Sequence, residues 1–248
     1  MPATPLLRAE GLRRRFGGVH AVDGVDLQVA AGELRCIIGP NGAGKSTFFQ
    51  LLTGRVRPDA GRILLDGRDI TRRHPFERAR LGIAVKVQNL GVFAELTVAH
   101  NLAIPLQRQL PERDLPAATE SMLARLGLGG LEDRLVRSLA HGQKQWLALG
   151  MALAMKPRLL LLDEPTAGMS PEETRATGEI VRAVNGDGVA VIVIEHDMAF
   201  VRQLEAPVTV LHYGRIFAEG SLAEIESHEE VRHLYLGTMA PRSASPPT

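Results

Sequence analysis

Cysteine is almost absent from the sequence, since Cys36 is the single one in 248 residues. One cysteine excludes an internal disulfide bond and a zinc site made of several cysteines. Because Cys36 lies in an apolar stretch, we expect it to be a small residue of the protein core. A chain without disulfide bonds is typical of a reducing compartment, which indicates the cytosol.

Long apolar runs are absent as well. One of the longest, at residues 189–194, falls far short of the roughly 20 residues that a membrane-spanning helix requires. Residues 1–11 lack the apolar centre of a signal peptide. We therefore expect a soluble protein. If it serves a membrane, another protein supplies the membrane-spanning segments.

Neither charge sign dominates, because 29 basic and 28 acidic side chains leave a net charge of +1. A surface that follows nucleic-acid phosphates normally shows a clear basic excess, so no nucleic-acid partner is expected. Aromatic residues make up only 4% of the chain, and the core must therefore consist mainly of Leu, Val, Ile and Ala. The length allows one large α/β domain or two small ones.

Short apolar runs predict a parallel sheet. They lie at residues 34–38, 159–162 and 189–194, and nearly continuous apolar strands are typical of sheets that helices cover on both faces. Hairpin-like segments at residues 6–16, 25–29 and 62–65 add antiparallel strands. The pattern predicts an α/β fold with a mixed sheet core and an antiparallel β edge.

The middle of the chain is different, because residues 97–155 show helical spacing of apolar residues. Pro105, Pro111 and Pro116 are expected to divide this region into short helices. We predict one domain over residues 6–237. Its α/β lobe covers about 6–89 and 157–237, its inserted helical lobe covers about 90–156, and residues 238–248 form a flexible tail.

A phosphate-binding loop follows the first apolar run. Nine consecutive residues fit the pattern G-x-x-x-x-G-K-[ST]: Gly39, Pro40, Asn41, Gly42, Ala43, Gly44, Lys45, Ser46 and Thr47. Polyphosphate requires several converging backbone N–H groups, and glycine allows the chain to approach it closely. Lys45 can reach the β- and γ-phosphates, and the Ser46 hydroxyl can bind Mg²⁺. The loop predicts ATP and Mg²⁺ as cofactors.

Two carboxylates follow the second apolar run. Asp163 stands where the predicted strand ends, which is where ligands bind in such sheets. We expect Asp163 to hold Mg²⁺ through its water shell. The next residue, Glu164, is then available to polarise an attacking water molecule.

Residues 139–143, with the sequence LAHGQ, resemble the signature loop of the ABC ATPase family, and the resemblance covers roughly residues 6–237. It implies ATP hydrolysis and two composite sites in a head-to-tail dimer of ATPase subunits. In this family the loop begins a helix whose N-terminus contacts the γ-phosphate bound by the other subunit. The implied contacts come from Ala140, His141, Gly142 and Gln143.

The same resemblance assigns three further residues. It implies that Gln88 contacts Mg²⁺ and the attacking water, that His196 contacts the γ-phosphate, and that Phe16 stacks on adenine. For Phe16, packing within the core is an alternative. The chain also departs from the family at two positions. Ala140 replaces the commoner serine, and Ser170 stands where many members have aspartate.

Within the family, the chain resembles importer subunits for branched-chain amino acids and for urea or short amides. Segments that carry this resemblance lie at residues 141–146, 195–198 and 234–237. It implies a peripheral location at the cytoplasmic membrane face, transmembrane permease subunits as partners, and an indirect link to a substrate-binding protein. Residues 89–102 would include the docking surface for the permease.

Two other functions compete with import. ABC-type ATPases that act on DNA carry a long coiled coil before the signature loop, whereas only about fifty residues separate Gln88 from this loop. Ribosome-associated members carry two cassettes, and this chain has one. A nucleotide-binding regulator without turnover is the third possibility, but Glu164 would have no purpose in it.

Overall fold

The structure is a computed structural model that describes residues 5–86 and 91–236, with the backbone alone for residues 233–236. The predictions for Gln88 and for a flexible tail at residues 238–248 therefore lie outside the described residues. None of the described helices is long and apolar enough to cross a membrane.

A six-stranded mixed sheet forms the centre of the molecule. The strand order is β10-β9-β3-β8-β7-β6, and β10 alone runs antiparallel to its neighbour. The strands are β3 (Leu34–Ile38), β6 (Ile83–Lys86), β7 (Leu159–Asp163), β8 (Ala190–Ile194), β9 (Val208–His212) and β10 (Arg215–Gly220). The three apolar runs of the sequence correspond to β3, β7 and β8, which are almost wholly buried.

The antiparallel strands of the first half form a sheet of their own. Its order is β2-β1-β4-β5. The strands are β1 (Leu7–Phe16), β2 (Val19–Val29), β4 (Ala60–Leu65) and β5 (Arg68–Asp69). The α/β fold with mixed and antiparallel sheets is thereby confirmed.

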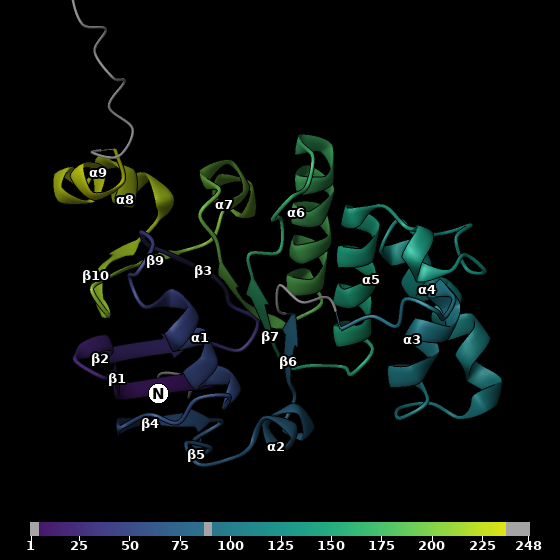
Figure 1. Cartoon of the computed structure of the whole chain (residues 1–248), viewed down its shortest axis with the longest axis horizontal. Coiled ribbons are helices and arrows are strands. Elements are labelled where there is room, and N and C mark those ends of the chain that lie inside the picture. The colour runs from purple at the N-terminus through teal and green to yellow at the C-terminus, as the bar shows by residue number, and fades with distance from the viewer. Residues whose placement is uncertain (1–4, 87–90, 237–248) are drawn as a thin grey trace, which may run out of the picture.

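Helix α1 (Lys45–Thr53) lies between the two sheets (Figure 1). Phe48 and Phe49 from α1 are buried in one cluster with Leu7 and Leu12 of β1 and Ile37 of β3. This cluster joins both sheets to the helix that follows the phosphate loop. The start of α1 is therefore held at the carboxyl end of β3 by a rigid apolar support.

Further helices lie on the other side of the six-stranded sheet. They are α3 (Val98–Leu106), α4 (Leu115–Arg125), α5 (His141–Leu153), α6 (Pro171–Gly186) and α7 (Met198–Leu204). Helix α5 contacts β6, α6 contacts β8, and α7 packs against α6, whereas α3 packs on the outer side of α5 and α4 on α3 (Figure 1). Pro105 lies inside the last turn of α3 and does not separate two helices, because α3 ends one residue later. Pro116 occupies the first turn of α4, where no N–H is needed. The lobe boundaries near 90 and 156 stay a prediction.

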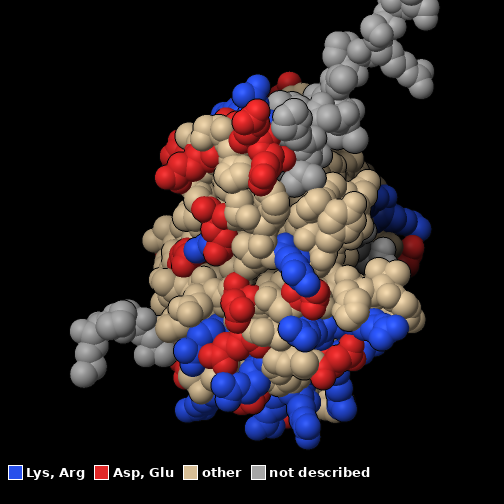
Figure 2. Space-filling model, turned by 90° about the vertical axis from the view of Figure 1, so that its left-hand side faces the viewer, with Lys and Arg blue, Asp and Glu red and all other residues tan. Residues whose placement is uncertain are grey.

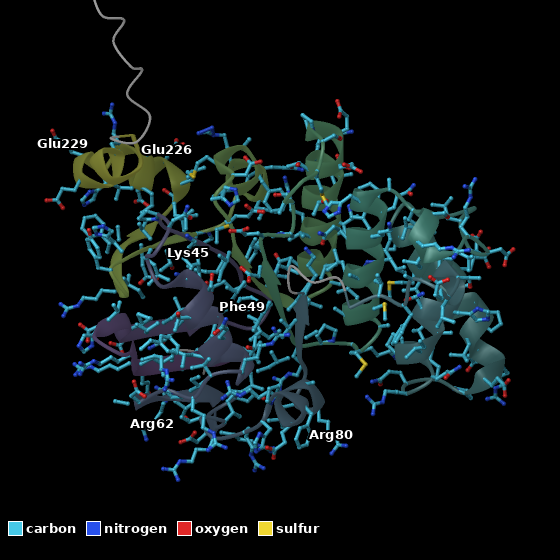
Figure 3. All side chains as sticks on the ribbon, viewed as in Figure 1. Lys45, Phe49, Arg62, Arg80, Glu226 and Glu229 are labelled. Carbon is cyan, nitrogen blue, oxygen red and sulfur yellow. The ribbon has the colours of Figure 1, made fainter. Side chains whose placement is uncertain are left out.

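The remaining helical elements are short. They are α2 (Pro75–Arg80), the 3₁₀ turns η1 (Glu112–Asp114) and η2 (Val136–Ser138), α8 (Leu222–Ser227) and α9 (Glu229–Leu236). Figure 1 shows α2 at one end of the molecule and α8 and α9 at another. In Figure 2 basic side chains gather toward the lower end and acidic ones toward the upper end. Figure 3 places Arg62 and Arg80 at the first end and Glu226 and Glu229 at the second. The net charge is therefore small because the basic side chains at one end and the acidic side chains at the other nearly cancel.

Candidate functional site

The phosphate loop connects β3 to α1, and glycine is required at two of its positions for steric reasons. A Cβ atom on Gly39 would lie 2.3 Å from the Leu211 carbonyl oxygen, and one on Gly44 would lie 2.1 Å from that of Ala21. Gly44 also has a φ of 101°, which disfavours every other residue. Close packing against the β9–β10 and β2 segments therefore determines the path of this loop.

Lys45 begins α1 (Figure 3), and its side chain folds back over the loop. Its Nζ donates hydrogen bonds to the carbonyl oxygens of Gly39 at 2.5 Å and Pro40 at 3.1 Å. Burial lowers the pKa of Lys45, and the carboxylates of Glu164 and Asp163 partly offset this effect. The ammonium group thus lies in the loop beside the two predicted catalytic carboxylates. Ser46, in the same first helical turn, is exposed.

A hairpin tip supports the loop from outside, and the sequence did not reveal this contact. The Gly214 N–H, between β9 and β10, donates to the Ala43 carbonyl at 2.8 Å. The Gly214 carbonyl accepts from the Asp23 N–H of β2, also at 2.8 Å. The loop is therefore fixed by backbone hydrogen bonds from residues far away in the sequence.

Asp163 and Glu164 lie at the carboxyl end of β7, as predicted from the sequence. Burial raises the pKa of Asp163, with a further contribution from the Glu164 charge, whereas Lys86 and Lys45 lower it. Glu164 has a φ of 44°, in the left-handed region, and its N–H donates to the Ile194 carbonyl at 2.9 Å. This unfavourable backbone conformation turns the chain sharply at the end of the strand.

His196 and Glu164 come together although they are 32 positions apart. Nδ1 of His196 lies 3.4 Å from Oε1 of Glu164. Most of the imidazole is exposed at the carboxyl end of β8, with 62% of the side chain accessible. The structure therefore assembles the predicted general base and the predicted γ-phosphate contact as one pair.

Glu195 was missed as a site residue. It is buried, with 1% exposure, and its two carboxylate oxygens bind different segments. Oε1 accepts from the Thr166 hydroxyl at 2.6 Å and from the Thr166 N–H at 3.3 Å. Oε2 accepts from the N–H groups of His196 at 2.9 Å and Asp197 at 3.3 Å. The sequence signal was a carboxylate directly after a fully apolar strand.

The signature loop lies at the start of α5, with Ala140 at the N-cap. The Ala140 N–H donates to Oε1 of Gln143 at 3.0 Å, and Nε2 of His141 lies 3.2 Å from the Ala167 carbonyl. Across the described residues, no hydrogen bond joins residues 139–143 to the phosphate loop. One chain alone therefore does not bring these two motifs into hydrogen-bond contact.

Phe16 lies at the end of β1 and is 45% exposed, so the alternative of core packing is wrong. The Arg14 guanidinium lies over its ring at 4.6 Å from the centroid. One face of the ring is thus occupied, and stacking of adenine on it stays a prediction.

The residues fit a magnesium ion that is held chiefly by phosphate and water. Ser46 and Asp163 offer hydroxyl and carboxylate oxygens, the ligands that Mg²⁺ prefers. Among described residues there is no group of three His, Cys, Asp or Glu side chains that could hold a metal ion by themselves. The protein would therefore supply only part of the metal coordination.

Comparison with known proteins identifies the family. The ABC transporter family profile matches residues 22–167. Three relatives of different function are similar over 94% of the chain. They are the branched-chain amino acid transport ATP-binding protein BraF of Pseudomonas aeruginosa (34% identical, 98% of its length), the lipopolysaccharide export ATP-binding protein LptB of Acidithiobacillus ferridurans (36%, 97%), and a ribose import ATP-binding protein of Rubrobacter xylanophilus (36%). The chain spans only 47% of the length of the ribose protein.

Solved structures agree with this result. A nucleotide-free ATP-binding cassette of an ABC transporter is 30% identical, with a TM-score of 0.84 over 93% of this chain and 98% of that one. A solved structure of an ABC transporter ATP-binding cassette in its ADP conformation is 31% identical, also with a TM-score of 0.84, over 95% of this chain and 100% of that one. The sequence suggested the importer branch for branched-chain amino acids and urea. The comparisons do not favour this branch over others, because relatives that export lipopolysaccharide or import ribose are equally similar. The chain belongs to the ABC transporter family, as an ATP-binding and ATP-hydrolysing subunit.

Proposed function

We propose that this ATPase hydrolyses ATP at the phosphate loop in a head-to-tail dimer and drives an importer through separate membrane subunits. The contact between Glu164 and His196, beside the ammonium of Lys45, is the observation that carries the proposal. It supports the proposal because it brings the side chains of Glu164, His196 and Lys45 to one edge of the sheet.

The chemistry follows from the positions of these groups. Lys45 exchanges its two loop carbonyl partners for β- and γ-phosphate oxygens. The Glu164 carboxylate orients a water molecule and accepts its proton as the water oxygen bonds to the γ-phosphorus. The bond from that phosphorus to the bridging oxygen breaks, and the products are ADP and inorganic phosphate. A magnesium ion, held by Ser46, Asp163 and Gln88, would neutralise phosphate charge.

A second subunit would complete the site. Helix α5 begins at the signature loop, and its free N–H groups and positive end favour an anion. Because this end makes no hydrogen bond to the phosphate loop of its own chain among described residues, we assign its γ-phosphate contact to the partner subunit. Identical or different ATPase subunits could both satisfy this geometry.

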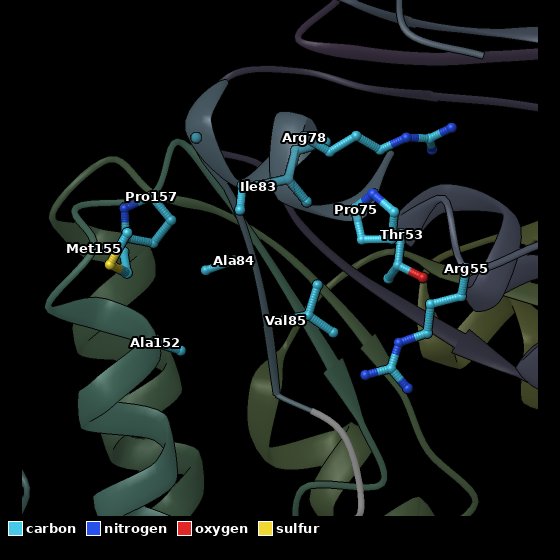
Figure 4. A pocket seen from close by; sticks show the side chains of 12 residues that line it. Thr53, Arg55, Pro75, Arg78, Ile83, Ala84, Val85, Ala152, Met155 and Pro157 are labelled. Carbon is cyan, nitrogen blue, oxygen red and sulfur yellow. The ribbon is translucent and has the colours of Figure 1, made fainter. Parts of the chain in front are cut away.

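A groove beside β6 supports docking of a membrane subunit. It has a volume of about 280 Å³ and lies between α2, β6 and the end of α5 (Figure 4). Ile83, Ala84, Val85 and Met155 give it an apolar lining, and Arg55 stands on its opposite side. An apolar segment of a permease would bury this surface. Residues 89–102, which were predicted to include the docking surface for the permease, come shortly after β6 in the sequence.

The solute is inferred from relatives and motifs. Branched-chain amino acid transport proteins from several bacteria are 32–34% identical to the chain over nearly their whole length. We therefore propose uptake of branched-chain amino acids, or of urea and short amides, at the cytoplasmic face of the membrane. Action on DNA or ribosomes has no support among these relatives.

The test replaces Glu164 by Gln, which keeps the shape and removes the proton acceptor. We expect the purified variant to bind ATP, to lose at least about 100-fold in turnover, and to accumulate as an ATP-bound dimer in size-exclusion chromatography. Glu172→Gln, on the exposed first turn of α6, is the matched control and should behave as wild type.

The same variants test the solute in cells that lack the native chain. Wild type and Glu172→Gln should restore uptake of labelled leucine or urea, whereas Glu164→Gln should not. Undiminished turnover by Glu164→Gln would refute the assigned base. Rescue of ribose uptake alone would refute the proposed solutes and leave the hydrolytic site intact.

A further inference from the structure

Glu195 connects the two segments that carry the predicted hydrolytic pair. Its Oε1 accepts two hydrogen bonds from Thr166, two residues after Glu164, and its Oε2 accepts from the N–H of His196. One buried carboxylate thus spans both turns. We propose that Glu195 is a positioning residue that sets the distance between Glu164 and His196; this rests on the proposed roles of that pair.

The backbone at Glu164 explains why such a residue is needed. A left-handed conformation at a residue other than glycine is unfavourable and persists only where neighbouring contacts enforce it. The Glu164 N–H is bound to Ile194, immediately before Glu195. Thr166 is bound to the Glu195 side chain on the other side of the turn. Both ends of the Glu164 turn are therefore attached to β8 and its first following residue.

Lys86 provides the opposite charge. It ends β6 and is only 4% exposed, and its Nζ has no hydrogen-bond partner among the described residues. The acidic groups that interact with its charge are Glu195 and Asp163. A buried carboxylate and a buried amine compensate each other's loss of hydration.

Glu195→Gln keeps the size of the side chain and changes only its charge and its hydrogen-bonding groups. The amide oxygen can still accept from Thr166, but the amide NH₂ would face the N–H groups of His196 and Asp197, so donors would oppose donors. The His196 turn should shift while the ATP-binding loop keeps its shape. Because a displacement of about 1 Å can cost 100-fold in rate, we expect kcat to fall 10- to 100-fold. KM and the Kd for an ATP analogue should change less than about twofold.

The matched control is Glu219→Gln. Glu219 lies on β10 and also accepts a hydrogen bond from a threonine hydroxyl, that of Thr209, at 2.8 Å. The Glu219→Gln variant should leave kcat and the Kd for the ATP analogue unchanged. The double variant Lys86→Met with Glu195→Gln removes both buried charges and should recover thermal stability without recovering kcat.

The outcomes separate three explanations. Loss of kcat in Glu195→Gln, with unchanged Kd and no recovery in the double variant, supports positioning. Recovery of kcat in the double variant would show that charge balance, not positioning, is what matters, and would overturn the proposal. A kcat equal to that of wild type in Glu195→Gln would overturn it as well. If Glu164→Gln also keeps full turnover, the proposed function itself fails, which is a different result.

Discussion

Arg78 should be one of the main stabilising residues of the lobe that carries the phosphate loop. It is 1% exposed, and Nη1 donates hydrogen bonds of 2.7 Å to the carbonyl oxygens of Leu51 and Leu52 at the end of α1. Nε donates to Arg73 at 3.1 Å, and Nη2 to Thr71 at 3.0 Å. One guanidinium group thereby satisfies carbonyls of α1 and of the loop before α2.

The size of the effect can be worked from these contacts. Four hydrogen bonds from a charged donor contribute about 1.5 kcal/mol each, or about 6 kcal/mol. Against this, burial lowers the pKa of Arg78 to about 10, a shift that corresponds to about 3 kcal/mol of lost hydration. Arg78→Met, which keeps the apolar stem, should therefore lower the free energy of unfolding by about 3 kcal/mol.

The assay is urea unfolding of the purified subunit, followed by circular dichroism and by fluorescence of Trp146, the single tryptophan. The midpoint should fall at a constant slope. Arg80→Met is the control, because Arg80 lies on the same helix and is exposed. Arg78→Lys, with fewer donors, should be intermediate. If Arg78→Met and Arg80→Met lose equal stability, or if Arg78→Lys equals wild type, the reasoning is refuted.

Two further predictions concern steric fit and burial. Gly44→Ala should cost about 2–3 kcal/mol in unfolding free energy and weaken ATP binding, because its Cβ would overlap the Ala21 carbonyl oxygen. Gly42→Ala should cost about 1 kcal/mol, since that glycine also has positive φ but no atom within 4 Å of the added Cβ; equal losses would contradict the steric argument. Burial raises the pKa of the Cys36 thiol to about 12, so a disulfide reagent should label it only after unfolding. Rapid labelling of the native chain at pH 8 would disprove that burial.

The sequence was sufficient for the elements that repeat a simple physical pattern. The runs at β3, β7 and β8 are buried on both faces, so they contain apolar residues without alternation, and their bounds could be read within a residue or two. The buried state of Cys36 was confirmed for the same reason. The phosphate loop was equally recognisable, because glycine and lysine are needed at fixed spacing.

The contacts that hold the site together could not be predicted in this way. Gly214 donates to Ala43 across 171 positions, and nothing in a turn glycine indicates which loop it will contact. Glu195 directly follows an apolar strand, and a carboxylate at such a position is often exposed. Only the fold shows that Glu195 is buried. The division into two sheets depends on strand pairing, which hydrophobic patterns leave open.

Ser170, one of the two departures from the family pattern, lies close to the signature helix through Glu173. Ser170 caps α6, where its side chain accepts from the Glu173 N–H at 3.2 Å and its own N–H donates to Oε2 of Glu173 at 2.9 Å. This places Oε1 of Glu173 where a Cβ on Gly142 would lie, at 2.2 Å. A side chain at position 142 would therefore displace the Glu173 carboxylate from this position. The Ser170 cap therefore sets the position of Glu173 beside the signature helix, while the hydrogen bond from Trp146 Nε1 to the Thr177 hydroxyl, at 2.9 Å, joins α5 to α6.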